Sequence, residues 1–419
     1  MIAMEILERR LEDVVLAQMA VDPVVVLHGP RAVGKSTLLR RIADRCGRPV
    51  LDLDEPETRE LVAGGPSFAI AGGGPVLVDE YQHVPEVLDA IKAQLNRDMR
   101  PGRFVLTGST SYSTIPRAAQ ALTGRAHVMT VWPLSQGEIT RRRESMVHRL
   151  FLDPDSALRA VSSPIDRLGY AELVLAGGFP IPLQRSDRRA RARWFADYLD
   201  LVIERDVLDI RRIRQRDVLP RLFRRLVAQT GQVINVAKAA RAEQILPTAA
   251  NDYAQLLEAV FLLHRLPAWG TTLGARVNAM PKVHVMDTGV GSWMLGIAIE
   301  TIERREPSAL TELGHLIETF AVNEILKQVG WADDSIRAGH YRTHDGDEVD
   351  LVLESSAGDV VAFEVKSGEL VRPADAGPLG RLRDKLGGRF MAGIVLHTGG
   401  SARPLGDRLH AAPLACLWS

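Results

Sequence analysis

The stretch "VVVLHGPRAVGKSTLLRRIADRC", residues 24–46, decides the fold of the N-terminal part of the chain. It begins with an apolar run, continues through a glycine-bearing turn and ends in an amphipathic helical pattern. Within it lies the spacing G-x-x-x-x-G-K-S, formed by Gly29, Gly34, Lys35 and Ser36. A turn of this kind between a buried strand and a helix cradles phosphate groups, because backbone N–H groups and the helix dipole point at the anion. The stretch therefore predicts an α/β domain with a phosphate-binding loop.

The loop carries the groups that a nucleoside triphosphate requires. Lys35 can reach the β- and γ-phosphates, and the Ser36 hydroxyl can ligate Mg²⁺. The chain has no N-K-x-D-type motif for guanine, so ATP is the expected nucleotide and Mg²⁺ its cofactor. We expect the ATP-binding residues to be Gly29, Pro30, Arg31, Ala32, Val33, Gly34, Lys35, Ser36 and Thr37.

A Mg²⁺-nucleotide site also needs carboxylates at the end of a neighbouring strand. The run "VLVDE", residues 76–80, is a short apolar strand pattern that ends in Asp79 and Glu80. We expect Asp79 to hold Mg²⁺ through water and Glu80 to polarise the attacking water. The alternative is that the pair only caps the following helix.

A third strand pattern, "RFVLTGST" at residues 103–110, ends in small polar residues. Ser109 or Thr107 could sense the γ-phosphate, and a turn-forming role is equally compatible with the sequence. Arg31 in the loop and Arg125 are candidates for contact with the γ-phosphate. Arg125 could act across a subunit boundary, which would make the protein a homo-oligomer; a plain surface arginine is the alternative for both.

The region that follows is helical in pattern and rich in arginine. Residues 185–225 contain thirteen Arg against seven Asp and Glu. Such an excess could neutralise phosphates of a nucleic acid. A solvated helix surface with internal ion pairs explains it equally well.

Residues 216–292 have the pattern of a winged helix, with three helices followed by two strand-like segments. The third helix, at residues 248–260, contains no Lys or Arg, although Asn251 and Gln255 could read bases. DNA recognition by this helix and a role in protein packing or oligomer contact both remain open.

The stretch "GDEVDLVLESSAGDVVAFEVKSG", residues 346–368, reads as a β-hairpin that carries Asp350, Glu364 and Lys366 among apolar residues. Glu364 and Lys366 are two apart on one strand and so share a face, which Asp350 can reach from the paired strand. Glu318 lies upstream in an apolar helical pattern. We expect Glu318, Asp350 and Glu364 to hold Mg²⁺, with Lys366 orienting or activating a water for phosphodiester attack. The alternative is a solvated, charged sheet face.

Composition supports an ordinary globular chain. Lys plus Arg and Asp plus Glu both total 52, so net charge names no partner. Cys46 and Cys416 are too far apart in sequence to suggest a metal or disulfide pattern. No apolar run is long enough for a membrane span or a signal peptide, so we expect no membrane partner and a cytoplasmic location.

Taken together, these motifs resemble a known group. "GPRAVGKST", "VLVDE" and "LTGS" resemble the ATPase core of AAA-superfamily P-loop proteins of the archaeal, STAND-related type. "GGFP" at residues 177–180, the winged-helix pattern and "GHLIE…DEVDLVLE…AFEVKSG" resemble bacterial predicted ATPases whose C-terminal domain looks like a PD-(D/E)xK nuclease. The resemblance implies the nuclease-type set Glu318, Asp350, Glu364 and Lys366. The segment after Lys366 departs from it, because it lacks the Gln/Tyr helix of many active RecB-like nucleases.

The expected fold is α/β throughout: a parallel-sheet ATPase core, a helical and winged-helix middle, and a C-terminal domain like a restriction endonuclease. The expected domains are residues 1–140, 141–215, 216–292 and 305–419. The leading functional hypothesis is an ATP-hydrolysing protein associated with DNA, with a Mg²⁺-dependent nuclease-like domain. The alternative is an ATP-dependent switch or assembly protein whose C-terminal domain only binds DNA or a protein partner.

Overall fold

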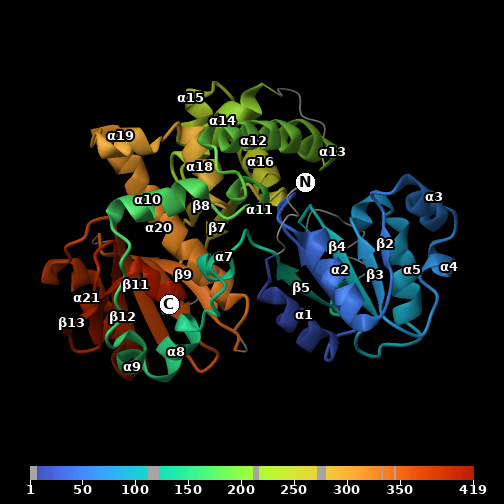
Figure 1. Ribbon diagram of the computed structural model, residues 1–419, viewed down its shortest axis with the longest axis horizontal. Helices are drawn as coiled ribbons and strands as arrows, with labels where there is room; N and C mark the ends of the chain where they lie inside the picture. Colours follow the sequence, from blue (N-terminus) through green and yellow to red (C-terminus); the bar gives the residue numbers. More distant parts are fainter. Residues whose placement is uncertain (1–6, 112–121, 211–216, 271–279, 333, 344–345) are drawn as a thin grey trace. The chain divides into compact units, whose positions relative to one another are not determined.

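The computed structural model describes residues 7–419 except 112–121, 211–216, 271–279, 333 and 344–345 (Figure 1). The described residues form two compact units. The first draws on Met1–Leu134, Tyr198–Arg214 and Gln255–Leu262, and the second on Ser135–Asp197, Gln215–Ala254 and Leu263–Ser419. The domain boundary expected at residues 215 and 216 lies outside the described residues.

The first unit is built on a five-stranded sheet in the order β2-β3-β4-β1-β5, in which all neighbours are parallel. Its strands are β1 (Val24–His28), β2 (Val50–Asp52), β3 (Val76–Asp79), β4 (Phe104–Gly108) and β5 (Ala126–Thr130). Its helices include α1 (Leu11–Met19), α2 (Lys35–Cys46), α3 (Pro56–Gly64), α4 (Pro66–Ala69) and α5 (Glu86–Leu95). The expected parallel-sheet core is confirmed.

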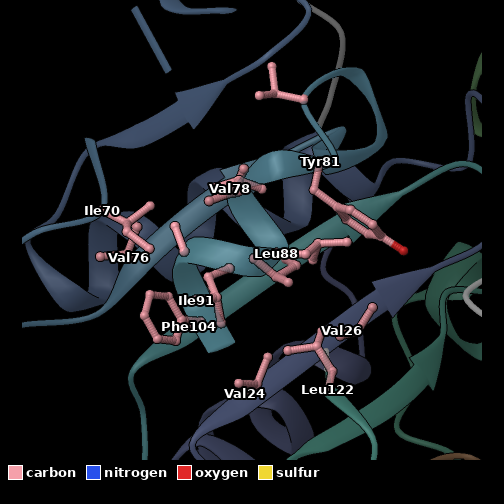
Figure 2. Packing of buried hydrophobic residues seen from close by; sticks show 14 of the residues in the cluster. Val24, Val26, Ile70, Val76, Val78, Tyr81, Leu88, Ile91, Phe104 and Leu122 are labelled. Carbon is pink, nitrogen blue, oxygen red and sulfur yellow. The ribbon is translucent and has the colours of Figure 1, made fainter. Parts of the chain in front are cut away.

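The central strands are apolar on both faces because helices cover the sheet on both sides. Val24, Val26, Val76, Val78 and Phe104 are buried in one core with apolar residues of α5. Figure 2 shows Leu88 and Ile91 of α5 turned toward this part of the sheet. This core holds the carboxyl ends of β1, β3 and β4 together at one edge, where the loops that follow them meet.

The second unit contains a small antiparallel sheet in the order β6-β8-β7. Its strands are β6 (Gln232–Val233), β7 (Leu263–Leu266) and β8 (Lys282–Val285). Along the chain they alternate with helices in the order α14, β6, α15, α16, β7, β8. The helices are α14 (Val218–Val227), α15 (Val236–Ala242) and α16 (Pro247–Ala259), of which α16 contributes residues to both units.

Further helices flank the strands of this sheet in the sequence. Those before β6 are α7 (Gln136–Thr140), α8 (Met146–Leu152), α9 (Pro154–Leu158), α10 (Arg167–Ala176), α11 (Pro180–Leu183) and α12 (Arg188–Leu201), and those after β8 are α18 (Thr288–Leu295), α19 (Ile299–Glu303) and α20 (Pro307–Val329). A π-helical turn (Val202–Asp206) and α13 (Val207–Ile210) continue α12. The helical middle expected from the sequence is confirmed. In the described part of the chain, none of the helices has the length and apolarity that crossing a membrane requires.

A six-stranded sheet in the order β13-β14-β12-β11-β10-β9 forms the C-terminal part. Its strands are β9 (Arg337–Arg342), β10 (Glu348–Glu354), β11 (Val360–Lys366), β12 (Phe390–His397), β13 (Arg403–Gly406) and β14 (Leu409–Pro413). β9, β10 and β11 are antiparallel, and α21 (Gly377–Leu386) leads from β11 to the parallel β12. The predicted hairpin is present, with Leu351 opposite Phe363.

The two sheets of the second unit are joined at an edge. Ala268, just after β7, forms a parallel bridge with His340 of β9. The Trp269 amide donates to the His340 carbonyl over 2.6 Å, and the Trp269 indole donates to the Glu354 carboxylate over 3.1 Å. The β7–β8 segment is therefore docked on the C-terminal sheet.

Candidate nucleotide site and C-terminal acidic cluster

The phosphate-binding loop connects β1 to α2, as expected. Gly29 is tightly enclosed, since a Cβ at this position would lie 2.3 Å from the Val131 carbonyl oxygen. Gly34 has a φ of +100°, a left-handed conformation that favours glycine. Both glycines of the motif are therefore required by the backbone. Pro30 and Val33 are buried and Ala32 is partly buried, whereas Thr37 is exposed on α2.

Lys35 is buried and folds back over the loop. Its Nζ donates to the carbonyls of Gly29 and Pro30 over 3.0 and 2.9 Å, and lies 3.9 Å from Glu80 Oε1. Burial lowers the pKa of Lys35, although Glu80 and Asp79 oppose this shift. The ammonium is thus held against the loop by two backbone carbonyls, which phosphate oxygens could replace.

Asp79, at the end of β3, is buried beside the loop. Its carboxylate accepts hydrogen bonds from the hydroxyls of Thr107 and Ser36. Burial raises the pKa of Asp79, and these two hydrogen bonds oppose the shift. The Ser36 hydroxyl and the Asp79 carboxylate are hard oxygen donors in contact, a donor set that suits Mg²⁺.

Glu80 is fixed by hydrogen bonds to both its backbone and its carboxylate. Its backbone is left-handed, with a φ of +51°, and its N–H donates to Thr107 Oγ1 over 3.1 Å. Its carboxylate accepts from the Gln82 amide and, over 3.2 Å, from the Ser109 N–H. Burial would raise the pKa of Glu80, but Lys35 and these donors outweigh burial and lower it. Glu80 is therefore an ionised carboxylate at neutral pH.

Two further residues of the site were missed by sequence reasoning. Gln82 links the segments that follow β3 and β4, because its amide donates both to the Glu80 carboxylate and, over 3.1 Å, to Ser109 Oγ. Arg9 donates to the Val33 carbonyl over 2.9 Å and to the Trp132 carbonyl over 2.6 Å, and so braces the loop. Neither residue belongs to a local pattern that would have singled it out.

The two candidate arginines have different positions. Arg31 lies in the loop and its Nε donates to Asp206 Oδ2 over 3.0 Å. Arg125 lies just before the first residue of β5. β5 is parallel to β1, so the phosphate-binding loop that follows His28 lies near Thr130, at the opposite end of β5. The structure therefore does not bring Arg125 to the phosphate-binding loop of its own chain, and its role across a subunit boundary stays a prediction.

The C-terminal candidates do converge, around a lysine that sequence reasoning left out. Lys282 Nζ lies 2.8 Å from an oxygen of each of Glu318, Glu348 and Asp350. Burial opposes the charge on Lys282, but the carboxylates outweigh burial and raise its pKa. Burial and the charge of Asp350 raise the pKa of Glu318. The cluster links β8, α20 and β10.

Glu364 and Lys366 lie on the adjacent strand and pair with one another over 2.8 Å. Asp350 Oδ2 accepts from the Val365 N–H over 2.9 Å, which ties it to the same strand. Burial and the nearby Asp350 raise the pKa of Glu364 to about 7. Asp350 and Glu364 are 6% and 8% exposed, so this is not a solvated sheet face.

The C-terminal residues do not fit a divalent cation in this arrangement. Over the residues that the structure describes, no group of three or more His, Cys, Asp or Glu side chains is arranged to hold a metal ion. The reason is visible in the contacts: Lys282 occupies one oxygen of Asp350 and one of Glu318, and Val365 occupies the other oxygen of Asp350. The Mg²⁺ ligand set of the C-terminal domain stays a prediction.

Part of the arginine-rich stretch is occupied by ion pairs. Arg221 and Arg225 each place Nε 2.9 Å from the Glu243 carboxylate. Arg188 lies 2.7 Å from Glu300. For these three arginines the structure favours a helix surface with internal ion pairs over a phosphate-binding surface.

Comparison with protein families divides the chain in three. Residues 21–140 match the AAA domain, residues 167–301 match a domain of unknown function (DUF8612), and residues 313–417 match another domain of unknown function (DUF4143). The AAA match covers the strand–loop–helix unit and the carboxylates described above. Over residues 21–140 the chain is therefore similar to AAA domains, in agreement with the P-loop ATPase core expected from the sequence.

Two uncharacterized mycobacterial proteins are similar over most of the chain. One is from Mycobacterium bovis and one from Mycobacterium tuberculosis; each is 26% identical over 345 residues, which are 82% of this chain and 70% of the relative. Among solved structures, the Walker-type ATPase of Pyrococcus abyssi is 16% identical with a TM-score of 0.40, over 69% of this chain and 96% of that one.

Proposed function

We propose that this protein binds and hydrolyses Mg²⁺-ATP in its N-terminal domain and uses the nucleotide state as a switch, with a C-terminal domain that binds DNA rather than cutting it. The observation that carries the proposal is the convergence of Lys35, Ser36, Asp79 and Glu80 at the carboxyl ends of β1 and β3.

Each residue of this group has a role that its contacts support. Lys35 exchanges the carbonyls of Gly29 and Pro30 for the β- and γ-phosphates of ATP. Ser36 and Asp79 would hold Mg²⁺, which supplies positive charge at the phosphate oxygens.

Glu80 is ionised and fixed in direction, so it accepts a hydrogen bond from the attacking water and orients it. Thr107 acts as a positioning residue, since its hydroxyl bonds both Asp79 and the Glu80 amide.

The proposal that the protein binds DNA rests on the order of its helices and strands. The order α14-β6-α15-α16-β7-β8, with an antiparallel β6-β8-β7 sheet, agrees with the element order of a winged helix and so supports this proposal. The order α20-β9-β10-β11-α21-β12 is compatible with the nuclease-like core that the sequence resemblance implies. Binding without cleavage is favoured because Lys282 forms ion pairs with Glu318 and Asp350, two of the three predicted metal ligands.

The test is ATP hydrolysis by the full chain, with and without double-stranded DNA. We expect Mg²⁺-dependent phosphate release that is abolished by Lys35→Ala and stimulated by DNA. Lys92→Ala, a lysine on α5 away from the loop, is the matched control and should leave the rate unchanged. Hydrolysis that survives Lys35→Ala would refute the ATP assignment, and a rate indifferent to DNA would refute the DNA half.

Cleavage of nucleic acid is the second candidate function, favoured by the meeting of Asp350, Glu364 and Lys366 on two paired strands. Incubation of plasmid with the protein and Mg²⁺ or Mn²⁺ tests it. Cleavage that is lost in both Asp350→Ala and Lys366→Ala would establish a nuclease and overturn the binding role. Cleavage unaffected by either change would come from a contaminant.

A further inference from the structure

Lys282 is the most enclosed charge in the C-terminal cluster. Its side chain is 1% exposed, and it extends from the first residue of β8 to carboxylates on α20 and β10. An ammonium so deeply buried is stable only with close opposite charges, which here lie 2.8 Å away on Glu318, Glu348 and Asp350.

The ammonium stands where the predicted ligand set would hold a metal ion. Glu318 and Asp350, two of the three predicted ligands, both direct an oxygen at Lys282 Nζ. The third, Glu364, has one oxygen on Lys366, and its other oxygen has no hydrogen-bond partner among the described residues. A divalent cation at this place would meet a fixed positive charge within contact distance of two of its ligands, and the repulsion is strong in a buried site.

We propose that Lys282 is the built-in cation of the C-terminal acidic cluster, and that it and a divalent metal ion exclude one another. While Lys282 is seated, Glu318, Asp350 and Glu364 take no Mg²⁺ or Mn²⁺, and the domain is silent as a metal-dependent nuclease. Removal of the ammonium converts the same carboxylates into a metal site. This inference concerns the carboxylates alone and does not depend on ATP hydrolysis.

The experiment measures Mn²⁺ binding by electron paramagnetic resonance without nucleotide. All proteins carry Lys35→Ala, so the N-terminal site contributes no nucleotide-bound metal. We expect the parent to show no Mn²⁺ binding that depends on Asp350. Adding Lys282→Met should create one Mn²⁺ site, tighter than any in the parent by at least about 100-fold. Adding Asp350→Asn should abolish it.

Lys327→Met is the matched control. Lys327 is also buried and paired on α20, with Glu324 at 2.5 Å, but Glu324 is not one of the predicted C-terminal ligands. Its removal should create no Mn²⁺ site that depends on Asp350.

Because removal of Lys282 leaves carboxylates without a counter-ion, a second variant protects folding. Lys282→Met with Glu348→Gln keeps all three predicted ligands and removes one negative charge. In both folded variants Mn²⁺ should raise the melting temperature, and in the parent it should not.

Two results would overturn the inference. The first is an Asp350-dependent Mn²⁺ site in the parent, seen when the parent is compared with its Asp350→Asn form, which would mean that lysine and metal do not compete. The second is a folded Lys282→Met protein, alone or with Glu348→Gln, that binds no Mn²⁺. The comparison of the parent with its Asp350→Asn form is decisive for the first result, whatever the stability of the Lys282 variants.

Discussion

The Arg31 guanidinium in the phosphate-binding loop donates to the carboxylate of Asp206, 175 residues later in the chain, over 3.0 Å. Asp206 is buried in the π-helical turn that follows α12, within the same compact unit as the loop. The pair therefore connects the predicted γ-phosphate contact to the segment that continues α12.

This pair predicts competition between Asp206 and the γ-phosphate for one guanidinium. Asp206→Asn should tighten ATP binding by about fivefold, because it releases Arg31. Arg31→Ala should weaken binding, and in that background Asp206→Asn should have no further effect. Fluorescent-nucleotide titration of the four proteins gives the coupling. Equal effects of Asp206→Asn in both backgrounds would show that the pair is structural only.

Thr107 is predicted to position Asp79, the last residue of β3, and Glu80, which follows it. Thr107→Val removes the hydroxyl that bonds Asp79 and the Glu80 amide, so kcat for ATP should fall by about tenfold while KM changes little. Thr107→Ser should restore most of the rate. Ser109→Ala should be milder, since the Ser109 N–H still donates to Glu80. Steady-state kinetics check this, and a change in KM alone would contradict it.

Two buried histidines on neighbouring strands of the small sheet, His264 on β7 and His284 on β8, predict a pH dependence of stability. The rings of His264 and His284 stack 5.4 Å apart. Burial lowers the pKa of His264 to about 4 and that of His284 well below its ordinary value. Between pH 6.5 and 4 the unfolded chain therefore binds more protons, so stability falls as the pH drops. For His264 alone the loss at pH 5 is about 2 kcal/mol.

Urea unfolding at pH 7.5 and pH 5 measures this loss. His264→Gln should reduce the difference between the two free energies of unfolding. His148→Gln, at an exposed position, should leave the difference unchanged. A difference equal in all three proteins would contradict the assignment.

The "GGFP" motif is explained by a buried cap rather than by chemistry. Gly177 has a φ of +67°, and a Cβ there would lie 2.3 Å from Asp287 Oδ1. Asp287 accepts from the Gly178 and Val290 N–H groups and caps α18. Gly177→Ala should cost about 3 kcal/mol or more of unfolding free energy.

Gly296→Ala is the matched control for this change. Gly296 also has a positive φ, +71°, but nothing lies within 4 Å of an added Cβ, so the cost should be about 1 kcal/mol. Denaturant unfolding compares the two variants. Equal costs would mean that the Asp287 contact is unimportant.

The nucleotide site was predictable because its residues lie in short local patterns. A strand, a glycine turn and a helix place Lys35, and a strand end places Asp79. Arg125 was singled out within "LTGRAHVMT" as a candidate for γ-phosphate contact, and its place before β5 rather than after it was not predicted.

Lys282 was missed because its partners on α20 and β10 come together only in the tertiary structure. A signal did exist: it is one of only seven lysines in the chain, and it opens the strand-like segment "KVHVMDTGV". A charged residue at the start of a buried strand requires a partner elsewhere. Asp206 and Gln82 gave no comparable signal.

The most direct test of the central claim is the fate of ATP on the Glu80→Gln protein. Wild-type and variant proteins are incubated with Mg²⁺ and ATP, separated from free nucleotide, and their bound nucleotide is identified by chromatography. The account predicts ADP or no nucleotide on the wild type, intact ATP on Glu80→Gln, and none on Lys35→Ala. ATP turnover by Glu80→Gln at the wild-type rate, or ATP retained by Lys35→Ala, would contradict it.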